Sequence, residues 1–204
     1  MSKVVQRGVQ LLFLALFLTL MVLGRIQVWM GIFVVSAIAS LLFSRFYCGW
    51  MCPINTLLKP VTWAKKKQHI KSFKVPKSLS SKWSRAFMLL LFLGVLVFTF
   101  RTGKKLPVLP VLVGLGFVLT LFFPEELWHH YLCPYGAIIS LPSRKAKHAM
   151  KIDEEACINC GKCAKVCPSL AIVKEEKHHS IIKNECLVCR ECVDACPNGA
   201  IAYT

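Results

Sequence analysis

Acidic side chains are scarce in this sequence, because 10 Asp and Glu stand against 26 Lys and Arg in 204 residues. The shortage is local: Glu125 and Glu126 are the only acidic residues before Ile152, whereas the last 53 residues hold eight acidic and six basic side chains. A strongly basic chain can bind nucleic acid. Here the positive charges lie in segments between long apolar runs, which favours membrane orientation and contact with membrane lipid over nucleic-acid binding.

Two other signatures are missing. No Gly-rich dinucleotide fingerprint occurs, so a flavin or a nicotinamide cofactor would belong to a partner protein. The long apolar runs contain no Asp, Glu, Lys or His. Because a path for ions or protons through a membrane usually needs such groups, we do not expect this chain to be an ion pump.

Four apolar runs are present, at about residues 8–23, 26–43, 86–100 and 106–123. Each is within a few residues of the roughly 20 that a helix needs to cross a bilayer. We therefore predict four transmembrane helices in two repeated hairpins, with a buried or re-entrant helix as the alternative for the short third run. Because a second run follows the first directly, we expect no cleaved signal peptide.

Positive charge alternates between the segments that connect these runs. The N-terminus and segments 45–85 and 144–151 together hold 16 Lys and Arg, whereas the alternate loops hold four, namely Arg25, Arg101, Lys104 and Lys105. This bias predicts a multi-pass protein of the cell (inner or cytoplasmic) membrane, with both termini and the long middle loop in the cytoplasm. The lysines of that loop either set the topology at the lipid surface or form a docking site for an acidic redox partner.

Eight of the 11 cysteines fall in two runs near the C-terminus, CINCGKCAKVCP from Cys157 and CLVCRECVDACP from Cys186, offset by 29 residues. Each run reads C-x2-C-x2-C-x3-C-P, the spacing with which bacterial ferredoxins hold [4Fe-4S] clusters. Three closely spaced thiolates let a tight loop face three irons, and the last cysteine of each run crosses to the other cluster. We therefore assign one cluster to Cys157, Cys160, Cys163 and Cys196, and the other to Cys186, Cys189, Cys192 and Cys167.

A zinc site or a disulfide framework is the alternative use of these cysteines. The tail is small, so the clusters must supply much of its folding free energy, and we expect it to be largely unfolded without iron. The cluster motifs also indicate a reducing compartment. His178 and His179 lie between the two runs in a polar segment where we expect a solvated turn, and no chemistry is assigned to them.

The tail resembles bacterial-type ferredoxins along its whole length. That resemblance implies a pseudo-twofold fold of two short βαβ-like halves and one-electron transfer at low potential. The predicted fold class is an α-helical membrane domain, residues 1–151, with four transmembrane helices, Cys-Pro motifs and a basic cytoplasmic loop. A small α+β ferredoxin domain with two [4Fe-4S] clusters, residues 152–204, follows it.

Two Cys-Pro motifs follow the second and fourth apolar runs, Cys48-Gly-Trp-Met-Cys52-Pro53 and His129-His-Tyr-Leu-Cys133-Pro134. Since histidine can replace cysteine as an iron ligand, one hypothesis is a further metal centre or cluster at the cytoplasmic membrane face, held by Cys48, Cys52, Cys133 and His129. The alternatives are packing thiols at helix ends or a redox-active pair near a quinone. For His129 and His130 the corresponding choice is interfacial placement or proton donation to a quinone.

The succession of four apolar runs, two Cys-Pro motifs and two cluster motifs resembles the NapH-like membrane polyferredoxins, the [4Fe-4S] quinol dehydrogenase membrane component family. The family's second motif reads C-x3-C-P, whereas this sequence has His129 in place of the first cysteine. The resemblance implies an oxidoreductase subunit. Quinone or quinol would be one partner, and a redox protein, such as a flavoprotein or another reductase, the other.

Three functions are compatible with these features. The first is electron exchange between the quinone pool and a redox partner. The second is assembly or maturation, in which a polyferredoxin reduces metal ions or an accessory factor. The third is a membrane anchor and wire for a flavoprotein reductase. Reduction or oxidation of the clusters that depends on quinone separates the first function from the other two.

Overall fold

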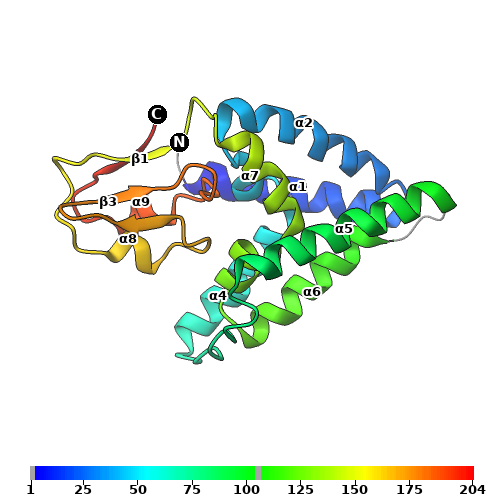
Figure 1. The fold of residues 1–204 in the computed structure, drawn as a ribbon, viewed down its shortest axis with the longest axis horizontal. Coiled ribbons are helices and arrows are strands. Elements are labelled where there is room, and N and C mark those ends of the chain that lie inside the picture. The colour runs from blue at the N-terminus through cyan, green and yellow to red at the C-terminus, as the bar shows by residue number, and fades with distance from the viewer. Residues whose placement is uncertain (1–2, 104–106) are drawn as a thin grey trace. The chain divides into compact units, whose positions relative to one another are not determined.

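The computed structural model describes residues 3–103 and 107–204 (Figure 1). Lys104 and Lys105, two of the predicted loop charges, and Leu106, the start of the fourth apolar run, lie outside the described residues. The chain divides into two compact units. One combines Met1–Cys52 with Ile139–Thr204, and the other is Pro53–Ile138.

The first unit begins with two long helices, α1 (Lys3–Val22) and α2 (Gln27–Phe43), which coincide with the first two apolar runs. Aromatic rings fill the space between them, because Phe17 meets Trp29 edge to face with ring centroids 5.3 Å apart. The short helix α3 (Phe46–Trp50) follows. The indole of Trp29 donates a hydrogen bond to the hydroxyl of Tyr47 at 2.9 Å, which fixes α3 to the helix pair.

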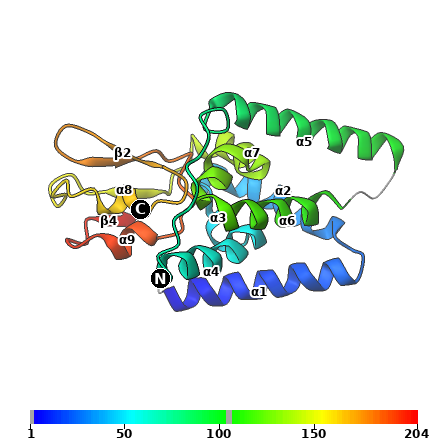
Figure 2. The same cartoon turned by 90° about the horizontal axis from the view of Figure 1, so that it is seen from below.

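The ferredoxin-like tail, residues 150–204, belongs to the same unit. Each half runs strand, helix, strand, in agreement with the expected βαβ order, and each strand pairs antiparallel with a strand of the other half. Met150 lies opposite Tyr203, and Ile172 opposite Ile181. Figure 2 shows the two helices of the tail together with β2 and β4. The elements are β1 (Met150–Ile152), α8 (Lys162–Lys165), β2 (Ile172–Lys174), β3 (His179–Ile181), α9 (Glu191–Ala195) and β4 (Ile201–Tyr203).

The core of the tail is small and rich in sulfur. Its buried members are Met150, Cys163, Cys167, Ala171, Cys186, Val188, Cys192 and Ile201. Half of these side chains are cysteines, and the hydrocarbon contribution to the core is correspondingly low. The fold of the tail therefore brings the cysteines of both runs into one interior.

The second unit contains α4 (Pro53–Lys67), α5 (Lys82–Thr102), α6 (Val108–Phe122) and the π-helix η1 (Leu127–Leu132), and α7 (Pro134–Ser143) begins in it. The third and fourth apolar runs are thus helical. The helix α4 occupies a segment that the sequence analysis placed in the middle loop. Pro53 at its first position and basic residues in its last turn are both favourable for a helix.

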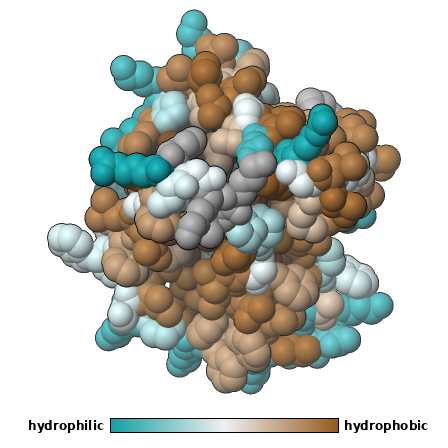
Figure 3. All heavy atoms as spheres, turned by 90° about the vertical axis from the view of Figure 1, so that its right-hand side faces the viewer, coloured by the Kyte–Doolittle hydropathy of each residue, from teal (hydrophilic) through white to brown (hydrophobic). Residues whose placement is uncertain are grey.

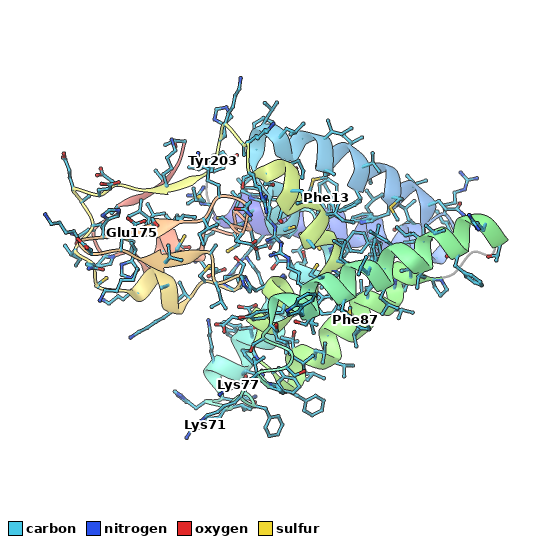
Figure 4. The ribbon with its side chains drawn as sticks, in the orientation of Figure 1. Phe13, Lys71, Lys77, Phe87, Glu175 and Tyr203 are labelled. Carbon is cyan, nitrogen blue, oxygen red and sulfur yellow. The ribbon has the colours of Figure 1, made fainter. Side chains whose placement is uncertain are left out.

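A lysine joins α4 to α6 within this unit. The ammonium of Lys65 donates to the backbone oxygens of Thr120 and Phe123, each at 3.1 Å. These carbonyls lie at the C-terminal end of α6, where the helix leaves its acceptors unsatisfied and favours a cation. Lys71 and Lys77, labelled in Figure 4, come from the segment that follows α4.

The apolar helices differ in whether they are long enough to cross a membrane. Among the described residues, Lys3–Val22 is the one helix long and apolar enough to cross, by length and composition alone. Gln27–Phe43, Trp83–Thr99 and Val108–Phe122 are apolar but shorter. Large apolar side chains are exposed along these helices, for example Leu12, Leu90 and Val118. Hydrophobic residues dominate the face drawn in Figure 3.

Candidate functional site

The first cysteine run surrounds a cavity. The four cysteines assigned to one cluster, Cys157, Cys160, Cys163 and Cys196, all line it. The first two lie in the loop before α8 and the third in α8, whereas Cys196 follows α9 in the other half of the tail. The structure thus brings together the three thiols of one run and the last thiol of the other. Cys160 is exposed and Cys163 is buried, so this cavity reaches the surface on one side.

The cysteines assigned to the second cluster lie in the interior. Cys186, Cys189, Cys192 and Cys167 are all at least nine-tenths buried. Two of these sulfurs accept hydrogen bonds from backbone amides, Cys186 from Val188 at 3.4 Å and Cys167 from Ala171 at 3.3 Å. Amide groups directed at sulfur are a usual means of adjusting the potential of an iron–sulfur cluster.

The repeat extends to backbone conformation. Three pairs of residues separated by 29 positions have positive φ in both halves, namely Asn159 and Val188, Gly161 and Arg190, and Leu170 and Gly199. A positive φ suits glycine and asparagine but is unfavourable for a β-branched valine, whose φ is 55°. The loops therefore hold the same unusual shape with different residues, as expected where the shape is imposed by a group that both loops enclose.

His179 differs from the solvated turn expected for it. Residues 175–177 of the turn are exposed, including Glu175, which Figure 4 labels. In contrast, His179 is only 4 % exposed and lines the cavity of the first cysteine set. Its Nδ1 atom is buried and has no hydrogen-bond partner among the described residues. A buried polar nitrogen without a partner is costly, and cluster sulfur would supply an acceptor. The donor set and this orphaned nitrogen both fit a [4Fe-4S] cluster.

Burial favours the neutral form of three thiols of the tail, Cys163, Cys186 and Cys192. Burial raises the pKa of Cys186 to about 11, although the Val188 amide lowers it, and burial together with the Cys186 sulfur raises the pKa of Cys192 to about 12. Burial also raises the pKa of Cys163. Because iron binds the thiolate, cluster assembly must release protons from these residues, and higher pH favours it.

Part of α3 forms a seat for the second cysteine loop. The indole of Trp50 donates to the Val188 oxygen at 3.2 Å. Gly49 lies so close to the loop that a Cβ atom there would overlap the Leu187 oxygen. From α1, Gln10 donates to the Gly49 oxygen at 2.7 Å.

A second glutamine of α1 reaches both sides of this seat. Gln6 donates to the Gly49 oxygen at 3.1 Å and to the Cys189 oxygen at 3.3 Å. The sequence pattern did not predict these contacts. The one available signal was the spacing of Gln6 and Gln10, which puts two polar side chains on one face of an otherwise apolar helix.

The tail is also joined to the end of α2. Tyr203, labelled in Figure 4, donates from β4 to the Phe43 oxygen at 3.2 Å. The hydroxyl of Ser44 donates to the Lys183 oxygen at 2.8 Å, and the His148 amide to the Leu42 oxygen at 2.8 Å. The seat and these contacts hold the second cysteine loop next to Cys48.

The four candidate ligands of the two Cys-Pro motifs are all buried. Cys48 lies in α3, and Cys52 lies two residues after its end. In the other unit, His129 lies in η1, and Cys133 is the residue after its end. The Cys133 sulfur accepts a hydrogen bond from the Gly136 amide at 3.4 Å. Within the described parts of the chain, no three His, Cys, Asp or Glu side chains are arranged to hold a single metal ion. A further centre at these four residues stays a prediction.

Comparison with known proteins matches most of the chain. A family model described as a 4Fe-4S binding domain matches residues 26–71 and 106–152, and one described as a 4Fe-4S dicluster domain matches residues 150–203. The first match contains both Cys-Pro motifs, and the second contains all eight tail cysteines. No solved structure matches.

Several curated proteins are similar to this chain. The ferredoxin-type protein NapH of Haemophilus influenzae is 26 % identical over 72 % of this chain and 56 % of its own length. The methylamine utilization ferredoxin-type protein MauN of Paracoccus denitrificans is 29 % identical over 70 % and 55 %. The putative electron transport protein YccM of Escherichia coli is 27 % identical over 69 % and 46 %. The chain thus spans about half the length of these relatives.

Proposed function

We propose, from the premise that the chain is a NapH-like polyferredoxin with [4Fe-4S] domains, that it exchanges electrons between the quinone pool and a redox partner protein. Its relatives are named as ferredoxin-type and electron transport proteins, in keeping with iron–sulfur electron transfer. The observation that carries the proposal is the gathering of eight thiols from two repeats in one small domain, with one complete set of four around a common cavity.

Different cysteines would have different roles in such an electron carrier. When bound, a [4Fe-4S] cluster accepts or donates one electron at a time. The buried thiols of Cys186, Cys189 and Cys192 would exclude water from one cluster, whereas Cys160 opens the other cavity toward a partner. A quinol that becomes a quinone loses two electrons and two protons. Two one-electron sites can take both electrons, while the protons go to the solvent.

Membrane attachment is part of this proposal. Quinones dissolve in lipid, so a chain that reacts with them must reach the bilayer. The apolar composition of α1 and the exposed apolar side chains of α2, α5 and α6 support four spans. The distribution of Lys and Arg between the connecting segments supports both termini in the cytoplasm. In that topology the tail and both Cys-Pro motifs lie on the cytoplasmic side.

The direct test is electron exchange between the purified full chain and a quinone. We expect duroquinone to reoxidise the dithionite-reduced protein. We expect duroquinol to reduce the oxidised protein to an extent set by the difference between the potentials of the quinone and the clusters. A binding site makes the rate saturate with quinone concentration. Stopped-flow absorbance under anaerobic conditions measures this rate.

A hydrophilic oxidant such as ferricyanide serves as the control, because it needs no lipid-soluble site. A duroquinone rate that stays linear in concentration would contradict the proposal. If copper or iron chelates were then reduced efficiently, the assembly or maturation function would be supported instead.

We also propose that Cys48, Cys52, Cys133 and His129 hold a further iron centre. The match of the first family model to both surrounding segments supports this ligand set, as does the correspondence between the two Cys-Pro motifs. Two four-iron clusters require about eight irons per chain. We expect more than about eight in the anaerobically purified protein. Iron and acid-labile sulfide analysis measures this.

The matched variant carries serine at Cys48, Cys52 and Cys133. Its iron content should return to about eight per chain, since the eight tail cysteines are unchanged. Equal iron contents in the two proteins would exclude the further centre and favour packing thiols or a redox-active pair.

A further inference from the structure

The second cysteine loop is held against a buried positive charge. Arg45, which directly precedes α3, is 1 % exposed. Its Nη1 atom lies 3.3 Å from the Oε2 atom of Glu185 and donates to the Glu185 backbone oxygen at 3.3 Å. Glu185 is the residue before Cys186, so the guanidinium stands beside the start of the cysteine loop.

A charge buried beside the cysteine loop acts strongly on a cluster that the loop binds. Water screens a buried pair poorly, and the Glu185 side chain is itself only 12 % exposed. Reduction of a cluster adds one negative charge, which a cation stabilises and an anion destabilises. Of the two partners, Arg45 is the more deeply buried, at 1 % exposure against 12 % for Glu185, and its guanidinium contacts the backbone one residue before Cys186. Its positive charge is therefore the less screened of the two at the start of the cysteine loop.

The first cysteine loop has a different environment. Ala156 occupies the position that corresponds to Glu185, 29 residues earlier. Cys160 is exposed to solvent, whereas Cys186, Cys189 and Cys192 of the second loop are all buried. The two halves of the repeat are similar in sequence and backbone, but their electrostatic surroundings differ.

We propose that Arg45 is a positioning residue for electron transfer, whose buried charge raises the reduction potential at Cys167, Cys186, Cys189 and Cys192 above that at the other four cysteines. This inference rests on the ligand assignment within the proposed function, and it adds the order in which the two cluster sites are reduced. An electron in the tail is favoured on the side of α3, next to Cys48, through the seat formed by Gly49 and Trp50.

The test is a redox titration of the full chain with its clusters, using mediator dyes and low-temperature EPR. We expect Arg45→Gln to lower one of the two potentials. At a fixed solution potential, the ratio of reduced to oxidised cluster should fall by about tenfold or more, and each factor of ten corresponds to a shift of 59 mV for one electron. The other potential should stay unchanged. Glu185→Gln should shift the same potential upward, and Arg45→Lys should retain most of the wild-type value.

Two further variants make the result decisive. Arg45→Gln combined with Glu185→Gln leaves no unpaired buried charge, and its affected potential should still lie below that of the wild type. Lys3→Gln removes a positive charge from the exposed pair with Asp194, 2.7 Å apart, and should shift neither potential. A Cys160→Ser background identifies the signal of the first set.

Unchanged potentials in Arg45→Gln, equal shifts of both signals, or a double variant at or above the wild-type value would overturn the inference. The titration uses a chemical reductant and no quinone. A failed quinone assay would therefore leave its outcome intact.

Discussion

Removal of iron by an anaerobic chelator is expected to unfold residues 150–204 while α1 and α2 keep their helical structure. The strands of the tail have three residues each and pair only two by two. Two-stranded sheets of this size are not stable alone, and a domain of this length rarely has enough core to fold without a staple. Half of the buried core is cysteine, so the ligand bonds replace hydrocarbon packing.

Hydrogen exchange followed by mass spectrometry measures this effect. Amides of β1, β4 and α9 should exchange at least about a hundredfold faster in the iron-free protein, which corresponds to about 2.7 kcal/mol of lost local stability. Reconstitution with iron and sulfide should restore protection, and the α1 and α2 amides serve as the internal control. A tail that stays protected without iron would contradict the cluster-dependent fold.

The sequence was sufficient for features that depend on local pattern. The two cysteine runs were identified by spacing alone, and Cys196 lines the same cavity as the first three cysteines of the other run. The apolar runs correspond to α1, α2, α5 and α6 because each run is long enough to favour a helix. The helix α4 was missed because its four lysines and low apolar content were attributed to a loop, although Pro53 is a favourable first residue.

Contacts between distant segments could not be predicted in this way. The hydrogen bond from Gln6 to Cys189 joins residues 183 positions apart, and the Arg45 pair spans 140. The periodicity of one segment gives no information on which distant segment it contacts. The burial of His179 was likewise hidden, because its neighbours Glu175, Glu176 and Lys177 are exposed residues of a turn, and only the pairing of β2 with β3 turns its side chain inward.

Substitution of Gly49 by alanine should disrupt the seat of the second cysteine loop. The added Cβ would overlap the Leu187 oxygen and lie 3.0 Å from the carbonyl carbon and oxygen of Val188. These are backbone atoms, so no flexible side chain can yield, and α3 or the loop must move. Overpacking of this kind costs about 1–3 kcal/mol, and the displacement would also strain the bonds from Gln10 and Trp50.

Gly31→Ala in α2 is the matched control, because an added Cβ there meets no atom within 4 Å. Alanine inside a helix is favoured over glycine by about 1 kcal/mol, so this variant should be as stable as the wild type or more so. Hydrogen exchange at Leu187 to Cys189 reports the seat directly, and Gly49→Ala should raise it while Gly31→Ala does not. The same exchange in both variants would mean that the loop does not rest on α3. A selective increase would establish that the cysteine loop is held in place by the helix that carries Cys48.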